Sequence, residues 1–141
     1  MVSEKDFSNV PTYQYYKHEI TNCKGEKFIF NEEYSFIYSL INKKNGKRYI
    51  GKTVNPKARL LSHFHGIQGG YHPNKSILAD RDDGFEYEIL ESKIEYPESA
   101  DREKFYMIKF KTYDPRFGYN MNDHRFKNGE CLTKLGRELI Q

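Results

Sequence analysis

The sequence predicts a small α/β domain of the α+β kind, in which a three-stranded antiparallel sheet is flanked by helices. Its 141 residues correspond to one ordinary domain. Residues 34–41 and 48–51 are rich in aromatic and β-branched side chains, and the pair Asn45-Gly46 lies between them. Because both residues of this pair tolerate a positive φ, the pattern predicts an antiparallel hairpin closed by a type I′ turn. Residues 85–91 largely alternate between apolar and charged side chains, which predicts the third strand.

A helix is predicted directly after the hairpin, over residues 56–65. Asn55 is a suitable N-cap, Pro56 fits the first helical position, and Gly66 fits the position just after the helix. Further helices are predicted over residues 74–80, over residues 97–111 with Ser99 as one possible cap, and over residues 132–140.

Composition and charge restrict the class of protein without identifying it. Hydrophobic residues make up 37% of the chain, and the 12 Tyr and 10 Phe supply much of the material for a compact core. The formal net charge of +3 is low for a chain that merely coats nucleic acid. Lysines and arginines gathered on one face would still permit DNA binding, and a solvated surface of mixed charge explains the same number.

The sequence also predicts a cytoplasmic protein. No apolar run approaches the roughly 18 residues of a membrane span, and residues 1–16 lack the apolar stretch of a signal peptide. Cys23 and Cys131 fit neither a CxxC pair nor zinc-finger spacing. Free thiols in a reducing compartment are therefore expected, with a disulfide between them as the alternative.

Four side chains of the hairpin and the first helix combine into a site suited to a phosphate. Tyr38 and Tyr49 lie in the two strands, while Arg59 and His63 share one helix face because they are four residues apart. Each of these residues, taken alone, is more often an ordinary strand tyrosine or part of a solvated helix face. Together they offer phenol, guanidinium and imidazole groups, and an arginine can stabilise negative charge that grows on a phosphoryl group.

One carboxylate, Glu103, is placed where it would more often be paired with a neighbouring group than serve a function. Glu103 lies three, four and seven residues before Tyr106, Met107 and Phe110, so it points along a mostly apolar helix face. An ionisable group in such a place is either paired with a neighbour or functional. One carboxylate with several waters is a usual arrangement for Mg²⁺, which can polarise a phosphate. A tyrosine beside positive charge can have a lowered pKa and take a proton from an attacking water.

The order of these residues resembles the signature of the GIY-YIG nuclease family. Phe36-Ile37-Tyr38, ten intervening residues and Tyr49-Ile50-Gly51 are similar to its two triplets. One departure is that Phe36 stands where the family has glycine, on the same predicted sheet face as Tyr38. The resemblance covers residues 34–122 and continues through Lys52-Thr53, Arg59, His63, His72-Pro73-Asn74-Lys75, residues 85–90, Glu103 and Tyr119-Asn120.

The resemblance implies a metal-dependent DNA endonuclease that hydrolyses phosphodiester bonds, similar to phage- and intron-encoded, homing-type members. The tyrosines would shape the site of the nucleophile, and the arginine would stabilise the transition state. The histidine would assist in proton handling or orientation, and the asparagine would hold the site by hydrogen bonds. Glu103 would bind Mg²⁺ or Mn²⁺. A phage-encoded enzyme would act in the cytoplasm of the host cell. The catalytic residues implied in this way are Tyr38, Tyr49, Arg59, His63, Glu103 and Asn120.

The extent of the resemblance sets the expected domain limits. Residues 1–33 would form an N-terminal arm with a short strand near residues 25–30. Residues 34–122 would form the catalytic domain, and residues 123–141 a tail with a short helix. Neither end is long enough for a separate DNA-binding module, so a free-standing nuclease is expected.

DNA contacts are expected from basic and polar residues around this site. His65 and His72 have no cysteine or acidic partner at zinc-ligand spacing, so contact with DNA is preferred there to zinc binding. For the lysines of the hairpin, a solvated turn is an equal alternative. The expected contacts are Lys52, Lys47, Arg48, His72, Asn74, Arg116 and Arg125, with Lys43, Lys44 and Lys127 as further phosphate ligands.

Two other functions compete with the endonuclease. One is a catalytically inactive nucleic-acid-binding module with the same fold, and the other is a structural or interaction protein. The complete set of site residues disfavours both, because neither function requires it. A homodimer that reads two half-sites would raise the sequence specificity of any of the DNA-binding alternatives.

Overall fold

The sheet has the strand order and direction that the sequence predicts. The computed structural model describes residues 19–22 and 24–120. Strand β3 (Ser35–Asn42) lies between β4 (Arg48–Thr53) and β5 (Phe85–Ile94), and both pairs are antiparallel. The predicted three-stranded antiparallel sheet is therefore confirmed.

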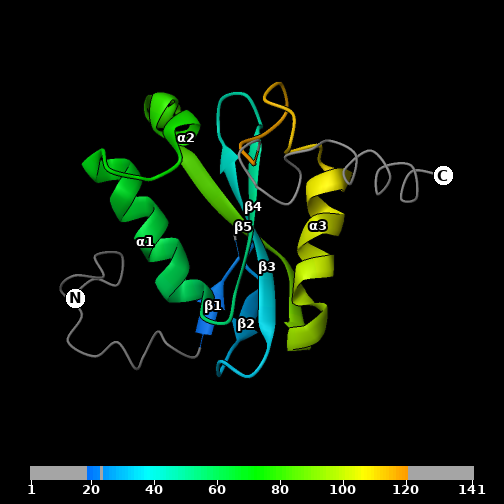
Figure 1. Ribbon diagram of the computed structural model, residues 1–141. Helices are drawn as coiled ribbons and strands as arrows, with labels where there is room; N and C mark the ends of the chain where they lie inside the picture. Colours follow the sequence, from blue (N-terminus) through cyan, green and yellow to red (C-terminus); the bar gives the residue numbers. More distant parts are fainter. Residues whose placement is uncertain (1–18, 23, 121–141) are drawn as a thin grey trace, which may run out of the picture.

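Helices cover both faces of this sheet. Helix α1 (Pro56–Gly69) and helix α3 (Ser99–Lys109) lie on opposite sides of it, as Figure 1 shows. The short helix α2 (Lys75–Ala79) and the 3₁₀ turn η3 (Arg81–Asp83) connect α1 to β5, and the 3₁₀ turn η4 (Tyr96–Glu98) precedes α3. The predicted α+β architecture is confirmed.

Helix α1 begins where the sequence predicts and ends later. Asn55 caps it, because its Oδ1 accepts a hydrogen bond from the N–H of Ala58 at 3.0 Å. The prediction that Gly66 follows the helix is wrong: the helix continues to Gly69, and Gly70, with a left-handed φ of 82°, ends it. A Cβ on Gly66 would lie 3.1 Å from the Cα of His72. A larger residue would require the His72 backbone to shift, so the glycine favours close packing of the His72 loop against the helix.

The turn between β3 and β4 is not the predicted type I′ turn. Gly46 has a φ of 79°, but Asn45 is not among the described residues with a positive φ. Asn42 organises the turn instead, since its Oδ1 accepts from the N–H groups of Lys44 at 2.7 Å and Asn45 at 3.1 Å. The connection therefore spans residues 43–47 and is longer than a two-residue turn. The Asn-Gly pair thus located the hairpin correctly but not the turn type.

The sheet separates two apolar clusters, because successive strand residues point to opposite faces. The cluster on the α1 side contains Phe36, Tyr38, Leu40, Leu60 and Ile67 among its buried members. The cluster on the α3 side contains Ile37, Ile50, Ile94 and Met107. Each face of the sheet therefore has a core of its own.

A second, two-stranded sheet precedes the main one. Strand β1 (Glu19–Thr21) pairs antiparallel with β2 (Lys27–Ile29), and we call the pair the N-terminal hairpin. The predicted short strand is confirmed as β2, whereas β1 was not predicted. Ile20 and Phe30 are 2% and 3% exposed and belong to the α1-side cluster. The described part of the N-terminal segment is therefore packed on the core.

Some predictions concern residues outside the described ranges. They are the helix over residues 132–140, the two thiols of Cys23 and Cys131, and the DNA contacts of Arg125 and Lys127. These stay predictions. Within residues 19–22 and 24–120, no helix is long and apolar enough to cross a membrane.

Candidate active site

The tyrosines of the two triplets lie on the same face of the sheet. Tyr38 is opposite Gly51 in the register, and Leu40 is opposite Tyr49. The ring centroids of Tyr38 and Tyr49 are 6.4 Å apart. A Cβ on Gly51 would lie 2.4 Å from the phenol oxygen of Tyr38. The glycine of the second triplet is thus a steric requirement of the tyrosine in the first.

Helix α1 brings a cation and an imidazole to the phenol of Tyr38. His63 is 6% exposed, and its Nε2 lies 2.6 Å from the Tyr38 oxygen. Nε of Arg59 donates to the same oxygen at 3.2 Å. Arg59 and His63 are four residues apart and therefore share a helix face, as predicted. From this face both side chains contact the same atom, the phenol oxygen of Tyr38 on β3.

A chain of hydrogen bonds fixes the direction in which the imidazoles donate. The N–H of Asn74 donates to Nδ1 of His72 at 3.0 Å. Because a backbone amide can only donate, a neutral His72 carries its proton on Nε2. This Nε2 lies 2.7 Å from Nδ1 of His63 and so donates to it. His63 then carries its own proton on Nε2 and donates to Tyr38, whose oxygen accepts from both His63 and Arg59.

Burial and the charge of Arg59 set the protonation of these groups. Desolvation, together with the charges of Arg59 and His72, lowers the pKa of His63 to about 3, and burial lowers the pKa of His72 as well. Both imidazoles are therefore neutral near pH 7, as the hydrogen-bond chain requires. Burial raises the pKa of Tyr38, although Arg59 acts in the opposite direction. The prediction of a lowered tyrosine pKa is wrong for Tyr38, because desolvation outweighs the nearby cation.

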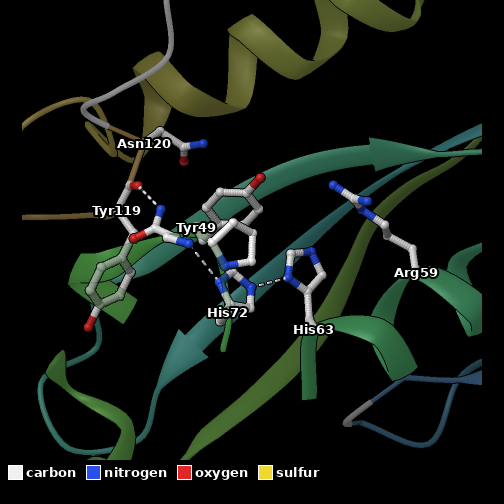
Figure 2. Close-up of a pocket in the computed structure, with 8 residues that line it drawn as sticks. Tyr49, Arg59, His63, His72, Tyr119 and Asn120 are labelled. Carbon is white, nitrogen blue, oxygen red and sulfur yellow. Dashed lines mark hydrogen bonds between the residues drawn. The ribbon is translucent and has the colours of Figure 1, made fainter. Parts of the chain in front are cut away.

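Arg59, His63 and His72 line a cavity of about 280 Å³. Figure 2 shows Arg59 and His63 reaching from α1 toward the phenol of Tyr49. The rings of His63 and His72 are stacked, with centroids 4.9 Å apart. The cavity is lined by Tyr49, Arg59, His63, His72, Pro73, Asn74, Tyr119 and Asn120.

Asn120 closes one side of the cavity by pairing with strand β4. Its Oδ1 accepts from the N–H of Ile50 at 2.8 Å, and its Nδ2 donates to the carbonyl of Ile50 at 3.0 Å. The side-chain amide of Asn120 therefore pairs with the backbone of Ile50 as a neighbouring strand would. This geometry is of the kind predicted for Asn120, a residue that holds the site by hydrogen bonds.

Comparison with known proteins decides the family. The family model described as the GIY-YIG catalytic domain matches residues 34–120, which is more than half of the chain. The chain belongs to the GIY-YIG family.

Solved structures agree with this GIY-YIG assignment. The catalytic domain of the homing endonuclease I-TevI matches with a TM-score of 0.54 and 27% identity, over 60% of this chain and 95% of that one. A mutant of the catalytic domain of the intron endonuclease I-TevI, in which alanine replaces a glutamate, matches with a TM-score of 0.56 and 26% identity, over 64% of this chain and 95% of that one. No curated protein matches the chain significantly. The predicted family, fold and enzyme type, a GIY-YIG endonuclease, are confirmed.

Glu103, the predicted metal ligand of this GIY-YIG chain, belongs to the helix on the other side of the sheet. It is 7% exposed and does not line the cavity. Its charge still reaches the tyrosine site, since it is one of the charges that raise the pKa of Tyr38, after burial and Tyr49.

The donor set of the GIY-YIG chain restricts the kind of metal. Among the residues that the structure describes, no group of three or more His, Cys, Asp or Glu side chains is arranged to hold a metal. A buried single carboxylate such as Glu103 fits a hydrated hard cation, which takes its other ligands from water and phosphate. It does not fit a zinc site made of protein ligands alone.

Two of the predicted DNA contacts lie inside the site, not on the open surface. His72 is 5% exposed and is bonded to His63, and Asn74 supplies the N–H that begins the hydrogen-bond chain. Sequence reasoning missed this partnership of His72. Gly66 was a usable signal, because a glycine inside a helix permits close approach of another backbone.

The predicted basic contacts differ in how free their charges are. Lys52 is exposed, and Lys47 is half-exposed in the β3–β4 loop. Arg116 is exposed, with its guanidinium 2.7 Å from the carboxylate of Asp114. Arg48 turns toward the α3 face, where it pairs with Glu88 at 3.1 Å and lies 4.3 Å from the ring centroid of Phe110. The Arg48 charge is therefore already engaged within the protein.

Tyr119 ties the loops around the cavity together, a role that the sequence did not reveal. Its hydroxyl donates to Asp80 at 2.8 Å and accepts from Nδ2 of Asn42 at 2.9 Å. Its carbonyl accepts from Nδ2 of Asn74 at 2.8 Å. Tyr119 is 1% exposed, and its bond with Asn42 is buried. These bonds join the β3–β4 turn and the start of α2 to the segment that carries Asn120.

Proposed function

We propose that this GIY-YIG chain is a metal-dependent DNA endonuclease that hydrolyses phosphodiester bonds. The observation that carries the proposal is that Arg59 and His63 meet at the oxygen of Tyr38 and line a cavity together with Tyr49. Family membership supports the reaction type, and the matched catalytic domain of a homing endonuclease supports DNA as the substrate.

Arg59 is the proposed ligand of the scissile phosphate. Its Nε is held by Tyr38, while its terminal nitrogens point toward Tyr49 at the cavity (Figure 2). The hydrogen bond with Tyr38 raises the pKa of Arg59, so the guanidinium stays charged. A fixed guanidinium stabilises negative charge that develops on a phosphoryl group and adds no reorganisation during the reaction.

Tyr49 is the proposed acceptor of the proton from the attacking water. Tyr38 is 0% exposed and burial raises its pKa, which makes it a neutral, sealed phenol. Tyr49 is half-buried and lines the cavity, so a water can reach its oxygen. Arg59 interacts with Tyr49 by a hydrogen bond and by its charge, so the two groups lie together at the cavity. Tyr38 and His63 would then hold Arg59 in place.

Glu103 is the proposed ligand of a divalent cation, Mg²⁺ or Mn²⁺. When bound, such a cation would polarise the phosphate and stabilise the leaving oxygen. Support comes from the chemistry of the donor set, a single buried carboxylate with electrostatic reach to Tyr38. The predicted features of a free-standing, phage- or mobile-element-like enzyme, a cytoplasmic location and a homodimer belong to the same proposal.

Nicking of a supercoiled plasmid, with and without Mg²⁺, tests this function. We expect the wild type to nick only with the metal, and Glu103→Ala to lose at least about 100-fold in rate while it still binds DNA. Asp101→Ala, an exposed acidic position on the same helix, is the matched control and should nick like the wild type. Equal cleavage by Glu103→Ala would exclude the metal–glutamate mechanism. A wild type that binds DNA and never cuts it would favour the inactive binding module.

A further inference from the structure

The N-terminal hairpin lies outside the matched family domain, but it contributes to the apolar cluster that contains Tyr38. The family match begins at residue 34, after both strands of the hairpin. Ile20 and Phe30 nevertheless belong to the same buried cluster as Tyr38 and Leu60. One continuous apolar cluster therefore runs from the hairpin, through β3, to the helix that carries Arg59.

Phe36, the departure from the family signature, is the point at which the hairpin contacts β3. It is 1% exposed. The rings of Phe28 and Phe30 meet it edge to face, with centroids 6.5 Å and 6.3 Å away and interplanar angles of 89° and 90°. A glycine at this position would leave both rings without their partner. Phe36 also shares a sheet face with Tyr38, two residues later, so the hairpin supports the strand beside the site tyrosine.

Asn22 attaches the hairpin to β5 in the way that Asn120 pairs with β4. Its Oδ1 accepts from the N–H of Ile89 at 2.8 Å, and its Nδ2 donates to the carbonyl of Ile89 at 3.3 Å. Ile89 is the Cα partner of Tyr38 in the sheet. An asparagine amide therefore replaces a neighbouring strand at each edge of the sheet, and both lie at the level of Tyr38 and the residue after it.

The segment that follows the hairpin reaches the start of α1. Oε2 of Glu32 accepts from Nδ2 of Asn55 at 3.1 Å. The other amide atom of Asn55, Oδ1, caps α1. Figure 1 shows β1 beside the end of α1 that Asn55 begins. The hairpin region therefore contacts both elements whose relative position sets the distance between Tyr38 and His63.

We propose that the N-terminal hairpin is a positioning element for the nuclease reaction, which acts through Phe36 and Asn22 to fix Tyr38 relative to α1. The inference rests on the proposed function and adds residues that touch neither the cavity nor the substrate. The hydrogen bond from His63 to Tyr38 spans 2.6 Å, and such a bond weakens steeply with displacement or misalignment. Loss of hairpin support therefore loosens the hold on Arg59 before the protein unfolds.

Steady-state nicking by Phe28→Ala and Asn22→Ala tests this positioning. We expect kcat to fall about tenfold, with KM and DNA affinity within about twofold of the wild type, because the cavity surface is unchanged. Phe28→Leu, which keeps most of the apolar volume, should restore most of the rate. Ile29→Ala changes the next residue of the same strand, which is 64% exposed, and should behave like the wild type. Ile94→Ala removes one buried side chain from the α3-side cluster. It should lower the free energy of unfolding and leave kcat unchanged.

The ring ¹⁵N NMR signals of His63 and His72 give a readout that does not depend on activity. In the wild type each ring should show the single neutral tautomer with its proton on Nε2. In Phe28→Ala and Asn22→Ala the His63 signals should move toward a mixture of tautomers, whereas Ile29→Ala and Ile94→Ala should keep the wild-type signals.

The two kinds of failure are distinguishable. Folded Phe28→Ala and Asn22→Ala proteins with wild-type kcat and wild-type His63 signals would overturn the positioning role. A wild type that nicks no DNA would overturn the proposed function, and the NMR comparison would still decide whether the hairpin positions His63 and Tyr38.

Discussion

The two faces of the sheet use the same two triplets for opposite purposes. On the α1 face, Tyr38 and Tyr49 enter a hydrogen-bonded site beside a cavity. On the α3 face, Ile37 and Ile50 are both 0% exposed within an apolar cluster. The strand period of two separates these side chains. The middle residue of each triplet therefore serves packing, and the tyrosines belong to the proposed active site.

The cations of the two faces differ in the same way. On the α3 face, Arg102 lies 4.5 Å from the ring centroid of Phe105 and 2.9 Å from the carboxylate of Glu91, so its charge is neutralised within the protein. On the α1 face, Arg59 is held at Nε by a phenol and lines the cavity with its other nitrogens. A phenol anchors the guanidinium without neutralising it, which leaves the charge available for a phosphate.

Substitution of Arg59 or Arg102 should give the largest difference in nicking rate. Arg59→Ala should lower kcat by about 100-fold or more, because it removes the fixed charge on the phosphate. Arg59→Lys should recover little of this loss, since an ammonium lacks the Nε that Tyr38 holds. Arg102→Ala should keep the wild-type rate. Plasmid nicking measures all three, and a large loss of rate in Arg102→Ala would contradict the division of roles between the faces.

A methyl group at Gly51 should disturb the α1 face specifically. The added Cβ lies 2.4 Å from the Tyr38 oxygen, and the 0% exposed ring has no space to move away. We expect Gly51→Ala to lower kcat about tenfold or more and stability by about 1–3 kcal/mol. Gly69→Ala is the control, because its Cβ meets the ring of Tyr71, which is 69% exposed and free to swing outward. Equal effects of the two substitutions would refute the steric role of Gly51.

The buried imidazole should make the α1 face sensitive to acid. The pKa of His63 is lowered from 6.5 in the unfolded chain to about 3 in the fold, chiefly by burial. Between these values the unfolded chain binds the extra proton, so the stabilising contribution is complete above pH 6.5 and is lost as the pH falls toward 3. Linkage predicts a loss of about 2 kcal/mol between pH 7.5 and pH 5.

Urea unfolding at pH 7.5 and pH 5 measures this loss, and His63→Gln is the comparison. The variant should lose less stability over the same interval because it cannot take up the proton at this position. Nicking should not show a transition from His63 between pH 5 and pH 8, since the folded ring stays neutral there. The same pH dependence of stability in both proteins would contradict a neutral, buried His63.

The smallest expected difference is in the salt dependence of DNA binding and concerns Arg48 and Lys52, two basic residues of β4. Arg48 is engaged by Glu88 and Phe110, so Arg48→Ala should lower stability by about 1 kcal/mol and leave the salt dependence of DNA binding unchanged. Lys52 is exposed, and Lys52→Ala should reduce the slope of log affinity against log salt by about 1. Fluorescence anisotropy with labelled DNA at several salt concentrations measures both. A reduced slope in Arg48→Ala would restore Arg48 as a phosphate contact.

Sequence periodicity was sufficient for the three strands of the main sheet and for the shared face of Arg59 and His63, although it missed β1. It failed where a contact joins distant segments. The pairing of His72 with His63 depends on a loop that folds back over Gly66, and Asn22 and Asn120 bond to strands 67 and 70 residues away. Local propensity contains no term for such contacts. The turn type was missed for a local reason, because the Asn42 side chain accepts from the N–H groups of Lys44 and Asn45 and closes a longer loop.

The sequence by itself determined the antiparallel hairpin, the capped helix behind it and the set of residues that identifies a GIY-YIG nuclease. These follow from local sterics, from the periods of strand and helix, and from residue order. Only the tertiary structure decided which groups are charged, which imidazole donates to which atom, and that a segment outside the family domain supports Tyr38. Those properties depend on burial and on distances between segments, and the pKa of His63 changes by several units because folding, and not composition, removes its water.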